Sequence, residues 1–190
     1  MTGGKAALIG MMASGKSTVG ARLAEMTGIA FLDADADLEA RAGMSVPECF
    51  AKLGEAGFRR LERETLRENL SRPDPLVIAL GGGAYMQEEI RRDLRAGAFS
   101  IYLRLSPAEI VARLEGSDIA ARPMLSSAPD WRCRARELTA AREPVYLEAD
   151  LVIEAGGLTV DGLAGKIAAA LAARGEFRMF FQAEAPRIET

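Results

Sequence analysis

Short apolar runs recur along the chain and alternate with longer stretches of helical period. Five runs are expected to form strands, over residues 6–10, 30–33, 76–80, 100–105 and 150–155. Helices are expected over residues 15–26, 36–43, 45–69, 87–96, 107–115, 129–142 and 160–174. Strands that are apolar without alternation are typical of a parallel sheet that is covered by helices on both faces. The pattern therefore predicts an α/β fold with a five-stranded parallel sheet.

The chain has 190 residues and shows no internal repeat, so a single domain is expected over residues 1–175. Residues 176–190 follow the last predicted helix without a clear period. We expect them to form a tail that lies on the surface or is partly disordered. Sheets of this kind bind ligands at the carboxyl ends of their strands.

Composition and charge narrow the class of function. The chain is 49% hydrophobic and 27% charged, with a net charge of -3, which argues against a nucleic acid or an anionic membrane as the main partner. No apolar run approaches membrane-spanning length, and no signal peptide pattern opens the chain. Cys49 and Cys133 have neither metal-ligand nor disulfide-framework spacing, and we expect two partly buried thiols. These features predict a cytoplasmic protein.

The chain contains no histidine. This absence excludes Ser-His triads, histidine metal sites and imidazole general bases. Acid–base chemistry must therefore fall to Asp, Glu, Lys or Tyr.

A phosphate-binding motif follows the first predicted strand. Gly10, Gly15, Lys16 and Ser17 match the pattern G-x-x-x-x-G-K-[ST], the P-loop. Its backbone N–H groups and helix N-terminus surround phosphate, the lysine contacts the β- and γ-phosphates, and the hydroxyl ligates Mg²⁺. The predicted nucleotide-binding residues of this motif are Gly10, Ala13, Ser14, Gly15, Lys16, Ser17 and Thr18. Ala13 stands where glycine is common, so we expect a negative φ there.

The P-loop predicts a nucleoside triphosphate but does not identify its use. The Asn-Lys-x-Asp motif by which GTPases recognise guanine would need an Asn-Lys pair, and the sequence has none. ATP is therefore the favoured nucleotide.

Three aspartates, Asp33, Asp35 and Asp37, follow the second predicted strand at alternate positions. A calcium-binding EF-hand is excluded, because its required glycine and glutamate are replaced by Leu38 and Met44. Carboxylates this close together need positive charge among them.

Further motifs follow in order along the chain: "LDADADLEARAG", "GEAGFRRLE", "LGGGA", "ARPML" and "REPVY". Together with the P-loop, this series resembles the shikimate kinases, small P-loop kinases of the nucleoside-monophosphate-kinase type. The resemblance covers about residues 6 to 170. It implies transfer of phosphate from ATP to shikimate, with Mg²⁺, to give shikimate 3-phosphate and ADP in aromatic amino-acid biosynthesis.

The resemblance also implies roles for particular residues. Asp33, with Ser17, would hold magnesium, and Asp35 would bind the acceptor hydroxyl and act as base. Asp37 matches no requirement of the family and is expected early in a helix, where the dipole favours a negative charge.

Arginines would recognise the acid group of the acceptor. Arg59 and Arg142 correspond to the family's carboxylate-binding positions, and an arginine fork fits a carboxylate. Gly81, Gly82 and Gly83 would let the backbone approach the substrate.

Residues 116–130 are small and polar, as expected of a mobile lid. The resemblance implies that Arg122 reaches over the phosphates as the third catalytic residue beside Asp35 and Lys16, and that Arg113 lies near the adenine. A surface role is equally open for Arg113. The implied partner is shikimate alone, with a monomeric enzyme.

Two rival functions stay open. A gluconate kinase or a nucleoside monophosphate kinase would explain the P-loop and the lid, but not the pair "GEAGFRRLE" and "LGGGA". A non-catalytic nucleotide-binding regulator would be expected to lack a magnesium-binding or base residue, and all of them are present here.

Overall fold

The computed structural model describes residues 4–120 and 122–177. Five parallel strands form one sheet in the order β2-β3-β1-β4-β5. The strands are β1 (Lys5–Ile9), β2 (Ala30–Asp33), β3 (Leu76–Ala79), β4 (Phe99–Arg104) and β5 (Leu151–Glu154). Each bound lies within one residue of the sequence-based expectation.

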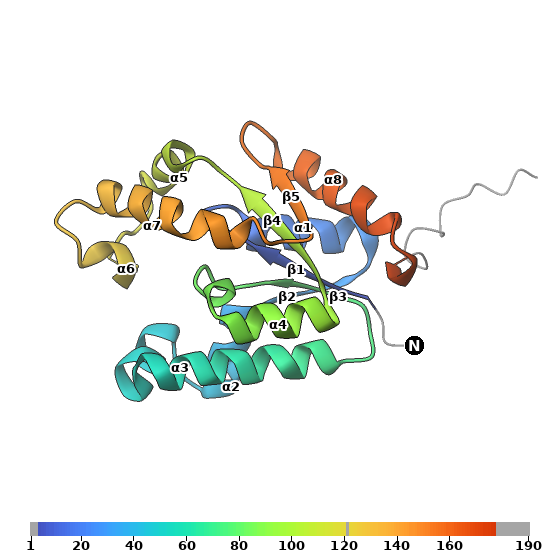
Figure 1. Cartoon of the computed structure of the whole chain (residues 1–190), viewed down its shortest axis with the longest axis horizontal. Coiled ribbons are helices and arrows are strands. Elements are labelled where there is room, and N and C mark those ends of the chain that lie inside the picture. The colour runs from blue at the N-terminus through green and yellow to red at the C-terminus, as the bar shows by residue number, and fades with distance from the viewer. Residues whose placement is uncertain (1–3, 121, 178–190) are drawn as a thin grey trace, which may run out of the picture.

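Helices connect the strands and cover both faces of the sheet (Figure 1). The α-helices are α1 (Lys16–Thr27), α2 (Ala34–Ala42), α3 (Val46–Ser71), α4 (Glu88–Gly97), α5 (Pro107–Leu114), α6 (Pro123–Ser126), α7 (Trp131–Tyr146) and α8 (Val160–Ala172). Two short 3-10 helices are η1 (Ala84–Met86) and η2 (Gly175–Phe177). The predicted fold class is confirmed.

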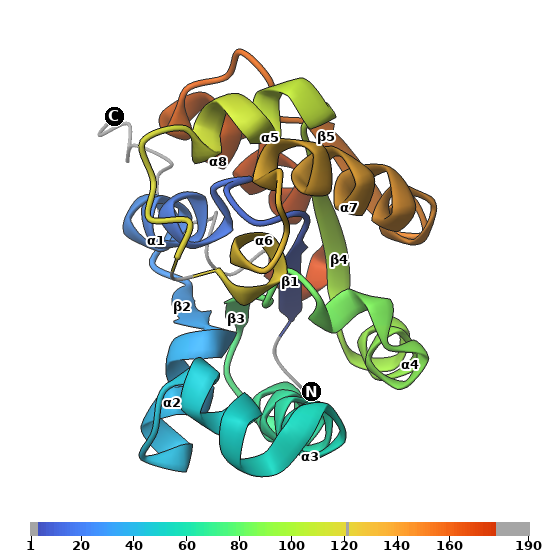
Figure 2. The same cartoon turned by 90° about the vertical axis from the view of Figure 1, so that its left-hand side faces the viewer.

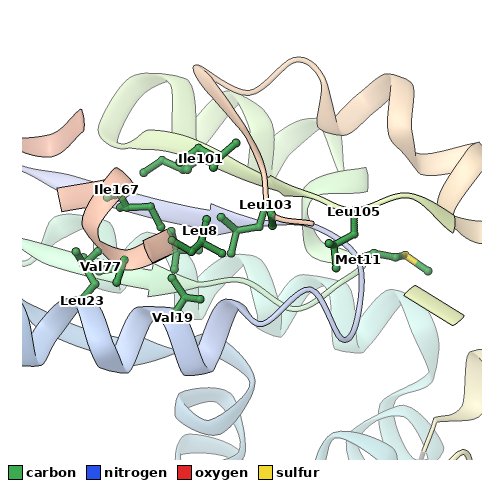
Figure 3. Close-up of a cluster of buried hydrophobic side chains, with 14 of the residues drawn as sticks. Leu8, Met11, Val19, Leu23, Val77, Ile101, Leu103, Leu105 and Ile167 are labelled. Atoms are coloured by element: carbon green, nitrogen blue, oxygen red, sulfur yellow. The ribbon is translucent and has the colours of Figure 1, made fainter. Parts of the chain in front are cut away.

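The core has two main layers because side chains of a strand alternate between the faces of the sheet. In β1, Ala6 and Leu8 face a cluster shared with α1, α5, α7 and α8. Figure 3 shows part of this cluster around Leu8, with Val19 and Ile167 contributed by helices. Ala7 and Ile9 face the opposite cluster, which α3 and α4 cover.

Helix α3 begins where the sequence predicts it. Ser45 and Glu48 form the expected capping box, with the Glu48 carboxylate 2.7 Å from the Ser45 backbone nitrogen. The sequence pattern did not predict the break at Gly54, where φ is 66° and ψ is 176°. The first turns of α3 therefore leave the axis of the rest of the helix.

The expected domain end at residue 175 falls too early. Phe177 is 1% exposed and belongs to the core cluster of α1 and α8. Residues 178–190 of the predicted tail lie outside the described residues. The cysteine prediction is also corrected, because Cys49 is buried but Cys133 is exposed. Within the described ranges, no helix is long and apolar enough to span a membrane.

Candidate active site

The predicted site residues meet at the carboxyl ends of the strands, the end of the sheet that Figure 2 faces. A cleft of about 280 Å³ opens there. The predicted residues that line it are Ala13, Gly15, Lys16, Ser17, Thr18, Asp33, Asp35, Gly82 and Arg122. Four segments that are distant in the sequence thus contribute to one cavity.

The loop between β1 and α1 needs unusual backbone angles. Gly10 has a φ of 143° and Gly15 a φ of 92°, values that favour glycine. Ala13 has a φ of 61°, so the expectation of a negative φ there is wrong. The loop must turn at this position to bring its N–H groups around one point, and alanine accepts the left-handed conformation at a cost of about 1–2 kcal/mol.

Lys16 is folded onto the loop that carries it. Its Nζ atom donates to the carbonyl oxygens of Gly10 and Met11, at 3.0 Å each. Burial lowers the pKa of Lys16 to about 8, against the opposing pull of Asp35 and Asp33. The ammonium is therefore held at the cleft without a direct carboxylate partner among the described residues, ready for an anionic ligand.

Asp33 joins the P-loop to the acidic segment. One carboxylate oxygen caps α2 by accepting from the backbone nitrogens of Asp35 and Ala36. The other accepts from the Ser17 hydroxyl at 2.5 Å. Two hard oxygen donors thus lie side by side, which is the chemistry that Mg²⁺ prefers.

Asp35 also lines the cleft. Burial and then the charge of Asp33 raise the pKa of Asp35, while Lys16 opposes them. Asp37 points elsewhere: it accepts from Arg41 at 2.9 Å and from Asn69 at 2.7 Å. It thereby ties α2 to α3 and is not part of the cleft lining.

On α3, Arg59 is paired with a residue to which the sequence assigned no role. Arg59 Nη1 donates to Glu62 Oε2 at 2.8 Å, and Gln87 Nε2 donates to the same oxygen at 2.6 Å. Glu62 is 8% exposed, and burial raises its pKa while Arg59 opposes the rise. A buried carboxylate whose second oxygen is not claimed by these donors is a candidate ligand for a substrate hydroxyl. The sequence shows Glu62 only as one of several alternating charges on a helix.

The three glycines after β3 are constrained by their neighbours. A Cβ atom at position 81 would lie 2.6 Å from Asp35 Oδ1, and one at position 83 would lie 3.1 Å from Arg59 Nη2. The loop therefore packs directly against both predicted substrate-binding side chains. The Gly82 carbonyl accepts from Arg142 Nη1 at 3.1 Å, which brings α7 to the same loop.

A second hollow of about 210 Å³ lies on the other side of the P-loop, lined by Ser14, Arg113, Leu158 and Thr159 among others. Arg113 Nη1 donates to the Ser14 carbonyl at 3.2 Å. The Ser14 hydroxyl is buried and has no hydrogen-bond partner in residues 4–120 and 122–177. Nε of Arg122, a residue that lines the first cleft, is likewise buried and has no hydrogen-bond partner among these residues.

A nucleotide cradle beside an acidic pair and a group of arginines defines a P-loop kinase that phosphorylates a small, negatively charged acceptor. Comparison with known proteins makes the class specific. The shikimate kinase family model matches residues 12–172. A shikimate kinase from Bordetella pertussis is 46% identical over 154 residues, which cover 80% of this chain and 71% of the relative. The chain belongs to the shikimate kinase family.

Comparison with solved structures leads to the same family. The shikimate kinase from Acinetobacter baumannii in complex with shikimate has a TM-score of 0.81 at 35% identity, covering 90% of this chain and 94% of the other. A gluconokinase from Sinorhizobium meliloti 1021 has a TM-score of 0.62 at 19% identity, covering 95% of this chain and 98% of the other. The second likeness shows a shared fold alone. The family resemblance predicted from the motifs is confirmed.

Proposed function

We propose that this enzyme transfers the γ-phosphoryl group of ATP to a hydroxyl of shikimate, giving shikimate 3-phosphate and ADP in aromatic amino-acid biosynthesis. The observation that carries the proposal is the convergence of Lys16, Asp35 and the Gly81–Gly83 loop at one cleft, with Arg59 and Arg142 directly behind that loop. This arrangement supplies a phosphate site and a carboxylate site within reach of one small molecule.

The nucleotide would lie along the P-loop. Lys16 would leave the Gly10 and Met11 carbonyls for the β- and γ-phosphates, where its charge stabilises the negative charge of the transition state. The buried Ser14 hydroxyl, which lacks a partner within the described residues, would gain a phosphate oxygen. Adenine would enter the second hollow, between Arg113 and the Leu158–Thr159 segment.

Ser17 and Asp33 would hold Mg²⁺, which neutralises phosphate charge when bound. Their oxygens are hydrogen-bonded to each other, and both are hard donors of the kind that a small hard cation prefers. Asp33 would keep its cap on α2 through its other oxygen.

The acceptor would bind on the side of Arg59, Glu62 and Arg142. The two arginines would pair with the carboxylate, and Glu62 would accept from a ring hydroxyl. Asp35 would orient the reacting hydroxyl and accept its proton as the new P–O bond forms and the bond to the β-phosphate oxygen breaks.

Arg122 would stabilise the transferred group from the segment 116–130, which we propose closes as a lid. Leu125 in α6 is fully buried and would anchor that segment. A monomer stays a prediction, and the biosynthetic family supports a cytoplasmic location.

The test is ADP release with a panel of acceptors: shikimate, gluconate and nucleoside monophosphates. We expect shikimate alone to raise turnover strongly. Preference for gluconate or a nucleotide would reject the acceptor assignment, and a protein that binds ATP but turns over with none of them would be the non-catalytic regulator.

A further inference from the structure

The carbonyl oxygen of Gly82 accepts two hydrogen bonds in the loop that borders the cleft. Arg142 Nη1 donates at 3.1 Å, and the Tyr146 hydroxyl donates at 2.5 Å. A carbonyl oxygen has two lone pairs, so these two donors saturate it. The shorter bond belongs to the tyrosine.

Tyr146 is fixed in place by its surroundings. It is 1% exposed, and its ring lies 5.0 Å from that of Tyr102 and 6.4 Å from that of Tyr85, measured between centroids. Burial raises the pKa of Tyr146, against the opposing effect of Arg142, so the hydroxyl stays a neutral donor. Its bond to Gly82 is therefore a fixed feature of the cavity wall.

Arg142 is the other side-chain donor to the Gly82 carbonyl. It lies one helical turn before Tyr146 on α7, its Nη1 atom donates to the Gly82 carbonyl and lies 3.7 Å from the Met11 sulfur, and its guanidinium also interacts with the Tyr146 hydroxyl. To form a two-pronged pair with a carboxylate, the guanidinium must be free to turn away from the carbonyl. The Gly82 carbonyl is partly buried, and the loss of its last protein donor there costs free energy, so this turn is easier if another donor remains.

We propose that Tyr146 is a positioning residue: its hydroxyl keeps the Gly82 carbonyl satisfied, so that Arg142 can leave that carbonyl and bind the acceptor's carboxylate. The inference rests on the proposed function, in which Arg142 recognises the acid group of shikimate. Without the phenol oxygen, Arg142 would be the one side-chain donor left to Gly82 within the part of the chain that the structure describes, and the carbonyl would compete with the substrate for the same N–H groups.

The experiment compares Tyr146→Phe with Tyr102→Phe. Both remove one hydroxyl from the same aromatic group, but of these two tyrosines only Tyr146 donates to the glycine loop among the described residues. Tyr146→Phe should raise the KM for shikimate about three- to tenfold, the range expected for one net hydrogen bond. The KM for ATP and kcat should stay within about twofold, and Tyr102→Phe should change none of them.

A double-mutant cycle separates positioning from general loosening. In an Arg142→Lys background, Tyr146→Phe should have little further effect on the KM for shikimate, because the arginine that it would have restrained is gone. An equal effect in both backgrounds would overturn the proposal, and so would an unchanged KM in Tyr146→Phe alone.

Failure of the proposed function gives a different result. A wild-type protein without shikimate-dependent turnover would reject both the function and the inference. Active wild type with an unaffected Tyr146→Phe rejects the inference alone.

If Tyr146→Phe does not fold, wild-type protein labelled with ¹³C at tyrosine Cζ provides the test, with Tyr85→Phe and Tyr102→Phe used for assignment. Saturating shikimate should shift the Tyr146 signal, because its hydroxyl then serves Gly82 alone, and leave the Tyr102 signal in place. A Tyr146 signal that does not move would overturn the proposal.

Discussion

The nucleotide side of the cleft and its acceptor side are built in opposite ways. The phosphate-binding part of the nucleotide side comes mainly from one continuous segment, Gly10 to Thr18, whose geometry is set by backbone angles within the segment. The acceptor side is assembled from α2, α3, the glycine loop after β3, and α7. It is held by side-chain hydrogen bonds, two of which join residues 25 and 60 positions apart in the sequence.

The difference shows which structural features make each side of the cleft specific for its ligand. A phosphate needs N–H groups and one cation, which a short loop supplies. A carboxylate with several hydroxyls needs charges and acceptors at fixed separations, which only packed helices supply. The acceptor side therefore keeps a buried carboxylate, Glu62, in contact with Arg59 and Gln87. Changes on the two sides should have separable effects on the two substrates.

Asp35→Asn should give the largest effect. It keeps the shape of the side chain but cannot take the proton of the hydroxyl, and a positioned base contributes about 10²–10⁴-fold to rate. We expect kcat to fall by about that factor, with ATP affinity close to normal by calorimetry. A variant that retained more than about a tenth of wild-type kcat would show that Asp35 is not the base.

Arg59→Lys and Arg142→Lys should come next. Lysine keeps the positive charge but loses the two-pronged fit to a carboxylate, so the KM for shikimate should rise at least about tenfold. The KM for ATP should change much less, and Arg60→Lys on the exposed face of α3 serves as the control. Should either substitution mainly weaken ATP binding, the two sides of the cleft would not be separable.

The pH dependence tests the nucleotide side. Because burial lowers the pKa of Lys16 to about 8, its positive charge is present below that pH and is lost as the pH rises through it. We expect kcat/KM for ATP, which reports the free enzyme, to fall about tenfold per pH unit above that value. The kcat for shikimate should be less sensitive, since bound phosphates retain the proton on Lys16. A profile that stays flat up to about pH 10, the ordinary lysine range, would contradict the burial of this ammonium.

Ala13→Gly should give the smallest effect. Glycine adopts a φ of 61° without the Cβ clash, but it also gains freedom in the unfolded chain. We expect a gain of at most about 1 kcal/mol in the free energy of unfolding, measured by denaturant titration, with ATP affinity unchanged. A clear loss of stability would mean that the Ala13 methyl group contributes packing that outweighs the strain.

The two sides also differ in how far the sequence predicted them. The strands and the P-loop follow from local pattern, and their bounds were found within one residue. The sequence did not predict the positive φ of Ala13, because the closure of the loop overrides the preference of alanine. Glu62 and Gln87 were missed because their roles depend on contacts 25 residues apart in the sequence. Phe177 was assigned to the tail because its burial depends on the surface left by α1 and α8.

For Asp37, the sequence predicted the position in a helix but not the residue that it contacts. The sequence places it in an acidic cluster with Asp33 and Asp35, and it was expected early in a helix for electrostatic reasons. The structure confirms its place in the first turn of α2. Its partner Asn69, 32 residues away, could not be read from any local pattern.

The most direct test of the account is ADP release from ATP and Mg²⁺, measured with and without shikimate, while ³¹P NMR follows the product. We expect shikimate to raise ADP release by about 100-fold or more, since the base and the acceptor hydroxyl act only when both are in place. One phosphate monoester of shikimate should form for each ADP. ADP release that does not depend on shikimate, or that yields only inorganic phosphate, would contradict the account.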